Sequence, residues 1–196
     1  MFAAFAGLAG FAQGTADAAQ DDVLPRPPQS RVRFANERIA DMFRVASARS
    51  ESFRALVAAI DESPSVLVYL GEGEGRCGTQ EFRSCLHIVS TVAGRRYLWV
   101  HLSSRRHAPD VIAQIAHELH HALEIAGHPE VVNAATLRQL YRGIGFRSCR
   151  DDQAQCWETD AAKTTERTVV REVAQARRGA FVSFAKTAAA PPASAR

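Results

Sequence analysis

The feature that most constrains the fold is an amphipathic segment in the middle of the chain. A helix is predicted over residues 109–126, because proline at position 109 suits a first helical turn and Gly127 is a typical residue beyond the last turn. Successive helical residues turn by about 100°, which places His117, His121 and Glu124 on one side. The opposite side is apolar and consists of Ile112, Ile115, Leu119, Ala122, Leu123 and Ala126. We therefore predict that this helix buries one face in a core, with a solvated surface helix as the alternative.

The elements around this helix indicate an α+β domain. Apolar residues recur at helical spacing in several segments, and runs rich in Val, Ile, Tyr and Trp predict strands between them. The predicted order is helices 36–48 and 52–61, strands 65–70, 86–92 and 95–102, then helices 109–126, 129–142 and about 157–178. Ala93-Gly94 would join the last two strands as a hairpin. We expect a small antiparallel sheet of about three strands, flanked by helices.

The two ends of the chain differ in composition from the part between them. Residues 1–18 form a short apolar run ending in Ala16-Asp17-Ala18, which resembles a signal peptide and its cleavage site, although no Lys or Arg precedes the run. Residues 19–30 are predicted to be a proline-rich linker, and residues 188–196 a disordered tail. We expect one domain over residues 31–187 in a secreted or periplasmic protein, without stable membrane insertion after the signal is removed. A buried N-terminal helix is the alternative for the first residues.

Four cysteines form two local pairs in the sequence. Neither pair has the two-residue spacing of a thiolate zinc knuckle, so disulfides are the simpler interpretation. We predict bridges from Cys77 to Cys85 and from Cys149 to Cys156, while other pairings remain open. Disulfides suit an oxidising compartment, which agrees with the exported location.

The segment 117–121, which reads His-Glu-Leu-His-His, points to metal chemistry. Two imidazoles one helical turn apart can bind the same cation, and His117 and His121 have this spacing. Glu118 lies one step round the helix, where its carboxylate can act on a water at an open coordination position. The pattern is the short motif His-Glu-x-x-His, and it predicts zinc as the cofactor. His120 lies off this pair and is expected behind the ligands or at the surface.

A catalytic zinc site needs a third protein ligand, and two glutamates compete for this role. Glu124 lies on the ligand face of the helix, but one further turn along the same straight axis. Glu158 would lie on the core-facing stripe of the last helix, where an unpaired carboxylate is costly and a cation would compensate it. The alternative for Glu158 is a half-exposed residue in a first helical turn.

His117-Glu118-x-x-His121 with a glutamate on a later helix resembles the gluzincin branch of zinc metallopeptidases, and the segment 117–124 is similar to small exported bacterial proteins that share the motif. The resemblance covers roughly residues 86–175 and rests on these few positions. It implies a zincin-like domain with His117, His121 and Glu158 as zinc ligands and Glu118 as general base. The glycine bend of the metzincins is absent, because Glu124 and Ile125 stand in its place.

These observations predict a zinc-dependent hydrolase that cleaves peptide bonds in a peptide or protein substrate. The alternative is an exported, disulfide-stapled zinc-binding or protein-interaction module without catalytic activity. Tyr141, His128 and Arg142 are candidates for the donor that stabilises an oxyanion, and Tyr141 could equally pack in the core. Residues 97–102 could pair with an extended peptide if their strand lies at the edge of the sheet. The formal net charge is +3 and the basic residues are dispersed, so nucleic-acid binding is not expected.

Overall fold

The structure is a computed structural model that describes residues 30–73, 84–103, 107–148 and 157–188. The described residues form, in chain order, β1 Val32–Phe34, α1 Glu37–Arg49, α2 Glu51–Glu62, β2 Val66–Glu72, β3 Ser84–Val92, β4 Arg95–Leu102, α3 Ala108–Ala126, α4 Ala134–Ile144, β5 Phe146–Arg147, β6 Trp157–Glu158 and α5 Asp160–Ala188. The predicted α+β class is confirmed. None of the described helices is both long and apolar enough to cross a membrane.

The main sheet differs from the prediction of about three antiparallel strands. It has four strands in the order β1-β2-β4-β3, and β2 pairs in parallel with both β1 and β4. The hairpin between β3 and β4 is antiparallel as predicted, and its turn residues Ala93 and Gly94 have φ of 48° and 77°. Strand β4 lies between β2 and β3, and it runs parallel to β2 and antiparallel to β3. Strand β4 is internal, so the condition for peptide pairing at residues 97–102 is not met; β1 and β3 are the two edges of this sheet.

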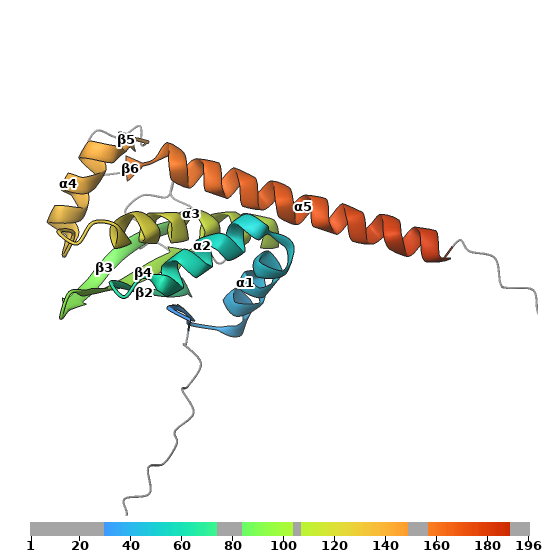
Figure 1. Cartoon of the computed structure of the whole chain (residues 1–196), viewed down its shortest axis with the longest axis horizontal. Coiled ribbons are helices and arrows are strands. Elements are labelled where there is room, and N and C mark those ends of the chain that lie inside the picture. The colour runs from blue at the N-terminus through green and yellow to red at the C-terminus, as the bar shows by residue number, and fades with distance from the viewer. Residues whose placement is uncertain (1–29, 74–83, 104–106, 149–156, 189–196) are drawn as a thin grey trace, which may run out of the picture.

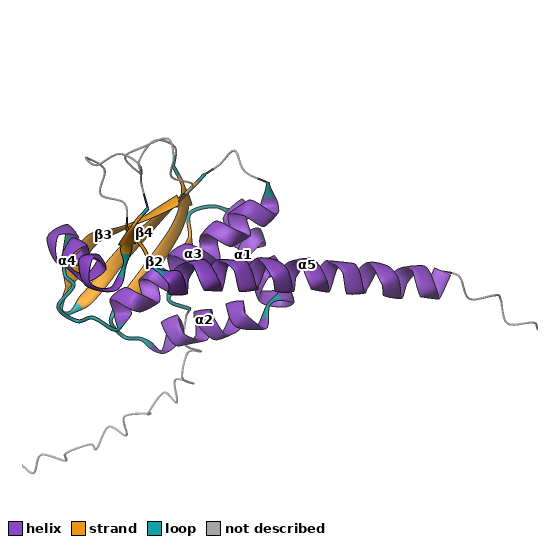
Figure 2. Cartoon of the chain, turned by 90° about the horizontal axis from the view of Figure 1, so that it is seen from above, coloured by secondary structure: helices purple, strands orange, loops and turns teal. Residues whose placement is uncertain are grey.

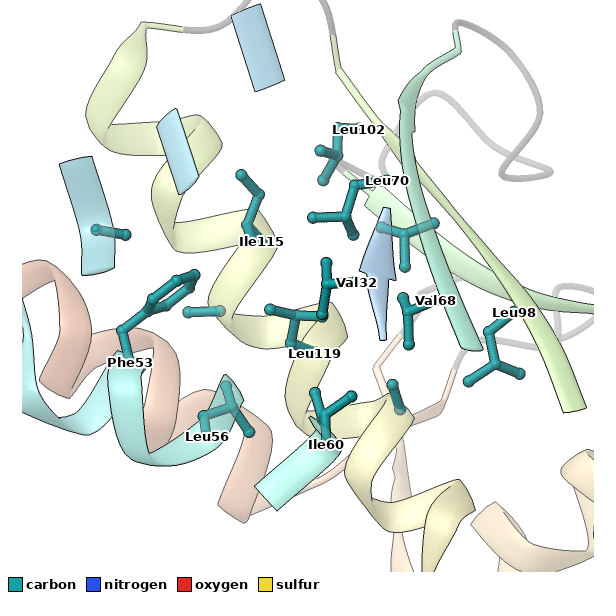
Figure 3. Close-up of a cluster of buried hydrophobic side chains, with 14 of the residues drawn as sticks. Val32, Phe53, Leu56, Ile60, Val68, Leu70, Leu98, Leu102, Ile115 and Leu119 are labelled. Atoms are coloured by element: carbon teal, nitrogen blue, oxygen red, sulfur yellow. The ribbon is translucent and has the colours of Figure 1, made fainter. Parts of the chain in front are cut away.

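The core lies between this sheet and the helices (Figure 3). Alternate residues of β2 and β4 point into it, so that Val68, Leu70 and Leu98 are fully buried. Phe53 of α2 and Leu119 of α3 meet them from the helical side and are also fully buried. Burial of each such side chain stabilises the fold by about 1.5–3 kcal/mol, and this packing holds α3 against the sheet.

Helix α3 lies between the sheet and α5, as Figures 1 and 2 show from two directions. Its apolar face packs on the sheet, as predicted. Its polar face is buried as well, because α5 covers it, and the exposed fractions of His117, Glu118 and His121 are only 8%, 4% and 6%. The alternative of a surface helix with solvated histidines is therefore wrong.

Helix α5 ends at Ala188, ten residues beyond the predicted end at about residue 178. Two helix starts also differ clearly from the predictions, and in both cases a capping residue decides the start. Helix α4 begins at Ala134 instead of residue 129, because the Asn133 side chain accepts hydrogen bonds from the Ala135 and Thr136 amides. Helix α5 begins at Asp160 instead of residue 157, because Thr159 Oγ1 accepts from the Ala162 amide at 3.1 Å. Glu158 is consequently in strand β6 and not in the last helix.

Several predictions concern residues outside the described part of the chain. These are the signal peptide at 1–18, nearly all of the linker at 19–30, and the tail at 188–196 beyond its first residue. Cys77, Cys149 and Cys156 also lie outside it. Cys85 in β3 is not a free cysteine, and both pairings remain predictions.

Candidate metal centre

His117 and His121 face each other across one turn of α3. Their Nε2 atoms are 3.2 Å apart, and their rings are 4.8 Å apart between centroids at an angle of 79°. The end of the helix is fixed to the sheet by Arg96 of β4, a buried residue that donates to the backbone carbonyl oxygen of Ile125 at 2.8 Å. A positive guanidinium at the C-terminal end also complements the helix dipole. The two imidazoles are therefore held on a rigid support.

Glu158 brings a carboxylate to the same point from β6. Its Oε2 is 3.2 Å from His117 Nε2, and the ligand atoms of His117, His121 and Glu158 all lie within 4.8 Å of one another. The three residues form a group that could hold a metal ion. Glu158 reaches it from a strand residue just before α5, and not from the helical stripe that the sequence suggested, since the pairing of Phe146 with Glu158 orients the backbone there.

Gly145 allows this strand pair to approach α4 closely. A Cβ atom at position 145 would lie 2.7 Å from the carbonyl oxygen of Glu158 and 2.9 Å from that of Tyr141. Real Cβ atoms do not come this close to backbone atoms, so a side chain here would push the two segments apart. The position of the Glu158 carboxylate thus depends on the absence of a side chain at Gly145.

Glu124, the competing candidate for third ligand, lies behind His121 instead of beside the ligand nitrogens. Its Oε2 is 2.7 Å from His121 Nδ1, and its Oε1 accepts a hydrogen bond of 2.7 Å from Thr159 Oγ1. Thr159 is adjacent to Glu158 and caps α5. Glu124 therefore orients the imidazole and ties α3 to the segment that carries Glu158.

Glu166 of α5 lies behind His117 as Glu124 lies behind His121. This residue was not predicted from the sequence. Its Oε2 is 3.0 Å from His117 Nδ1, so each histidine has a carboxylate behind the nitrogen that faces away from Glu158. Such carboxylates fix the ring orientation and tautomer of metal-binding histidines and raise their basicity. The available signal was that Glu166 lies two helical turns beyond Glu158, on the helix that was expected to face the site.

Contacts between histidines and carboxylates raise the pKa of His117 and lower the pKa values of two carboxyl groups. Burial lowers the pKa of His117, but contacts with Glu158 and Glu166 and the charge of Glu118 outweigh this and raise it to about 10. Burial raises the pKa of Glu158, but its contact with His117 outweighs this effect, so the pKa falls below the usual value. The pKa of Glu124 is lowered in the same way by His121. The site favours positive charge at its centre.

Glu118 and Tyr141 lie beside the three converging side chains. Ser84 Oγ, at the start of β3, donates a hydrogen bond of 2.6 Å to Glu118 Oε1. The Tyr141 ring packs edge-on against His121 at 5.2 Å between centroids. The Tyr141 hydroxyl is buried without a hydrogen-bond partner among the described residues, although Glu124 lies close enough to affect its pKa. Burial first, and then Glu124 and Glu118, keep that pKa well above its usual value, so the phenol stays protonated.

The remaining candidates lie away from the centre. His120 Nδ1 is 2.9 Å from Thr165 Oγ1, and its Nε2 is 3.7 Å from Glu124 Oε1, so it packs behind the carboxylate of Glu124. His128 contacts Glu130 at 2.9 Å in the loop after α3. Arg142 is exposed on α4. Of the three candidates for an oxyanion donor, only Tyr141 is next to the site.

The donor set fits a borderline divalent cation such as Zn²⁺. Two imidazole nitrogens and one carboxylate oxygen are a common set in catalytic zinc sites, and a carboxylate behind each histidine is the usual support. Comparison with known proteins adds no further identification: no family model, no curated protein and no solved structure matches this chain.

Proposed function

We propose that this chain is a zinc-dependent hydrolase that cleaves peptide bonds. The observation that carries the proposal is the convergence of His117, His121 and Glu158 within 4.8 Å, next to a buried glutamate that is not among the three. A purely structural zinc site uses four closed protein ligands, whereas three ligands with an adjacent acid are typical of catalytic sites.

His117, His121 and Glu158 would hold a zinc ion, which would act as a Lewis acid and lower the pKa of water to about 7. Glu118 would accept a proton from the attacking water and return it to the leaving amine. The hydrogen bond from Ser84 orients the Glu118 carboxylate for this transfer. Because its ring packs against His121 and its hydroxyl stays protonated, Tyr141 would donate to the developing oxyanion.

We propose an unfolded peptide or protein segment as the substrate. Strand β3 is the edge of the main sheet beside the site, since its Ser84 contacts Glu118, and an edge strand can pair with an extended chain. We further propose an exported location, secreted or periplasmic, from the composition of residues 1–18, and no nucleic-acid partner, from the dispersed charge.

Glu118→Gln tests the proposal, with Glu130→Gln as the control at an exposed glutamate away from the site. We expect about one zinc per chain in the wild type and in both variants, and loss of cleavage of an unfolded protein only in Glu118→Gln. Freshly purified protein without metal, together with cleavage that survives chelation, would overturn the proposal. Bound metal without cleavage of any peptide would favour the alternative, a zinc-binding module without catalytic activity.

A further inference from the structure

The strand pair β5–β6 places an aromatic ring beside the third candidate ligand. Phe146 and Glu158 are directly opposite each other in this antiparallel pair. Side chains of opposite residues point to the same face, with their Cβ atoms about 4.5–5.5 Å apart. Because the Glu158 carboxylate contacts His117, the Phe146 ring lies at the border of the metal centre. The exposed fraction of Phe146 is 38%, so part of this residue is open to a ligand.

Lys163 of α5 lies over this ring. Its Nζ atom is 4.4 Å from the centroid of the Phe146 ring, which is a cation–π contact. The first turn of α5 fixes the backbone of Lys163, because its amide donates to the carbonyl oxygen of Thr159 at 3.2 Å. Thr159 directly follows Glu158 in the chain. One helical turn therefore connects the ammonium group to the segment that carries the third ligand.

The ammonium group of Lys163 has no carboxylate partner in the described part of the chain, where its contact is with the Phe146 ring. The two acids that flank it in sequence, Glu158 and Glu166, both contact His117. Burial raises the pKa of Glu158 and contact with His117 lowers it, and the charge of Lys163 adds to the lowering. The positive charge thus acts on the metal centre, while an ammonium group has three hydrogens that it can donate to a ligand.

We propose that Lys163 and Phe146 form a subsite for a negatively charged group of the substrate, so that peptides with a carboxylate near the scissile bond are preferred. This inference rests on the proposed hydrolase function. The carboxylate would bind the Lys163 ammonium, and the methylene groups that carry it would pack on the open part of Phe146. An Asp or Glu side chain and the C-terminus of a peptide both supply such a carboxylate.

The charge of Lys163 would also exclude substrates. A Lys or Arg side chain placed in this subsite would meet a like charge, and such a juxtaposition lowers the affinity for the wrong ligand. The subsite therefore discriminates in both directions, with acidic peptides favoured over neutral ones and neutral peptides over basic ones.

Peptides that differ by one group test the preference and identify its source. The first set has an amidated C-terminus and carries Glu, Gln or Lys at each of the two positions beside the cleaved bond. The second set carries Gln there and ends either in an amide or in a free carboxylate. We expect kcat/KM to be about fivefold higher with the carboxylate in one of these sets, as for an ion pair near the surface. The set that shows the effect distinguishes a side chain from a C-terminus.

Substitutions at Lys163 assign this preference to its charge. Lys163→Met should abolish it, Lys163→Glu should reverse it in favour of the Lys peptide, and Lys163→Arg should keep it. Arg167→Met is the matched control, because Arg167 lies one turn further along α5 and contacts Thr164. Equal kcat/KM for acidic and neutral peptides, or a preference that persists in Lys163→Met, would overturn the subsite. Cleavage of the neutral peptide would still support the hydrolase function.

A binding experiment separates the subsite from catalysis. Fluorescence anisotropy measures the affinity of the same peptides for the zinc-loaded variant Glu118→Gln, in which we expect no cleavage. The peptide with the carboxylate should bind about fivefold more tightly than its neutral counterpart, and Lys163→Met in this background should remove the difference. If the wild type cleaves no peptide, this difference in affinity would still support the subsite while the hydrolase function fails. Equal affinities, or no binding of either peptide, would overturn it.

Discussion

Glu166 Oε2 lies 3.0 Å from His117 Nδ1, on the side of the ring that faces away from Glu158. This carboxylate fixes the tautomer in which Nε2 is available to a cation. We predict that Glu166→Gln weakens zinc binding by about 10–100-fold, as loss of such a partner usually does. Competition with a chromophoric chelator measures the change. Glu172→Gln, on the same helix but bound to Ser50 and Ser52, should leave the affinity unaltered.

Metal binding should depend on pH through His117. In the metal-free protein the pKa of this histidine is raised to about 10 from its usual value of about 6.5. Its stabilising contribution is therefore complete below about pH 6.5 and is lost as the pH rises through about 10. A metal must displace that proton, so zinc affinity rises over the same range by about one log unit per pH unit.

Calorimetry in buffers of different ionisation enthalpy measures this effect and should find about one proton released from His117 on metal binding near pH 7.5. His120→Gln is the control, because burial lowers the pKa of His120 and leaves no proton there to displace. Zinc affinity that does not vary between pH 6.5 and 8.5 would contradict the prediction.

Substitution by Ala should change the unfolding free energy in opposite directions at Gly145 and at Gly143. Gly145→Ala would place a Cβ 2.7 Å from the Glu158 carbonyl oxygen, and such overpacking costs about 1–3 kcal/mol of unfolding free energy. The displaced Glu158 would also bind metal more weakly. Gly143→Ala meets no atom within 4 Å on helix α4 and should stabilise the protein by about 0.5–1 kcal/mol. Chemical denaturation and zinc titration of both variants distinguish them; equal effects would show that the close contact at Gly145 is unimportant.

Local sequence signals predicted the histidine pair and most helices, because hydrophobic periodicity and turn residues act over a few positions. The parallel pairing of β2 with β4 could not be predicted in this way, since it depends on where the β3 hairpin folds back. Strand β1 has only three residues, too few for a pattern.

The position of Glu158 was predicted for a reason that proved wrong. A helix starting at residue 157 would place it on a core-facing stripe, yet the helix begins after Thr159, followed by Asp160 in the first turn. Thr followed by an acidic residue is a typical helix start, so this boundary could have been predicted from the sequence. Helical spacing could place Glu166 on the face of α5 that points to the site, but its contact with His117 and that of Ser84 with Glu118 join residues 49 and 34 positions apart, and no local pattern gives these partners.

Glu172 should make stability depend on pH independently of the metal. Burial raises the pKa of Glu172, but hydrogen bonds from Ser50 and Ser52 at the start of α2 outweigh this effect and lower the pKa below its usual value. A lowered folded-state pKa stabilises the protein above about pH 4.5 and loses this effect as the pH falls through the folded value. Glu172→Gln should therefore have a lower melting temperature than the wild type at pH 7. The difference in melting temperature between the two proteins should be smaller near pH 3. A constant difference at all pH values would contradict this assignment.

Tyr141→Phe separates the two interpretations of this residue, an oxyanion donor or a packing residue. The phenyl ring would keep its edge-on contact with His121, so zinc affinity should stay within a factor of about two, and removal of a buried hydroxyl without a described partner should not lower stability. If the hydroxyl donates to the oxyanion, kcat falls by about 10²–10³-fold with little change in KM, because the hydrogen bond forms only as charge develops. Steady-state kinetics on a fluorogenic peptide measures this split. Full kcat in Tyr141→Phe, with the fold intact, would leave the residue as a packing partner of His121 alone.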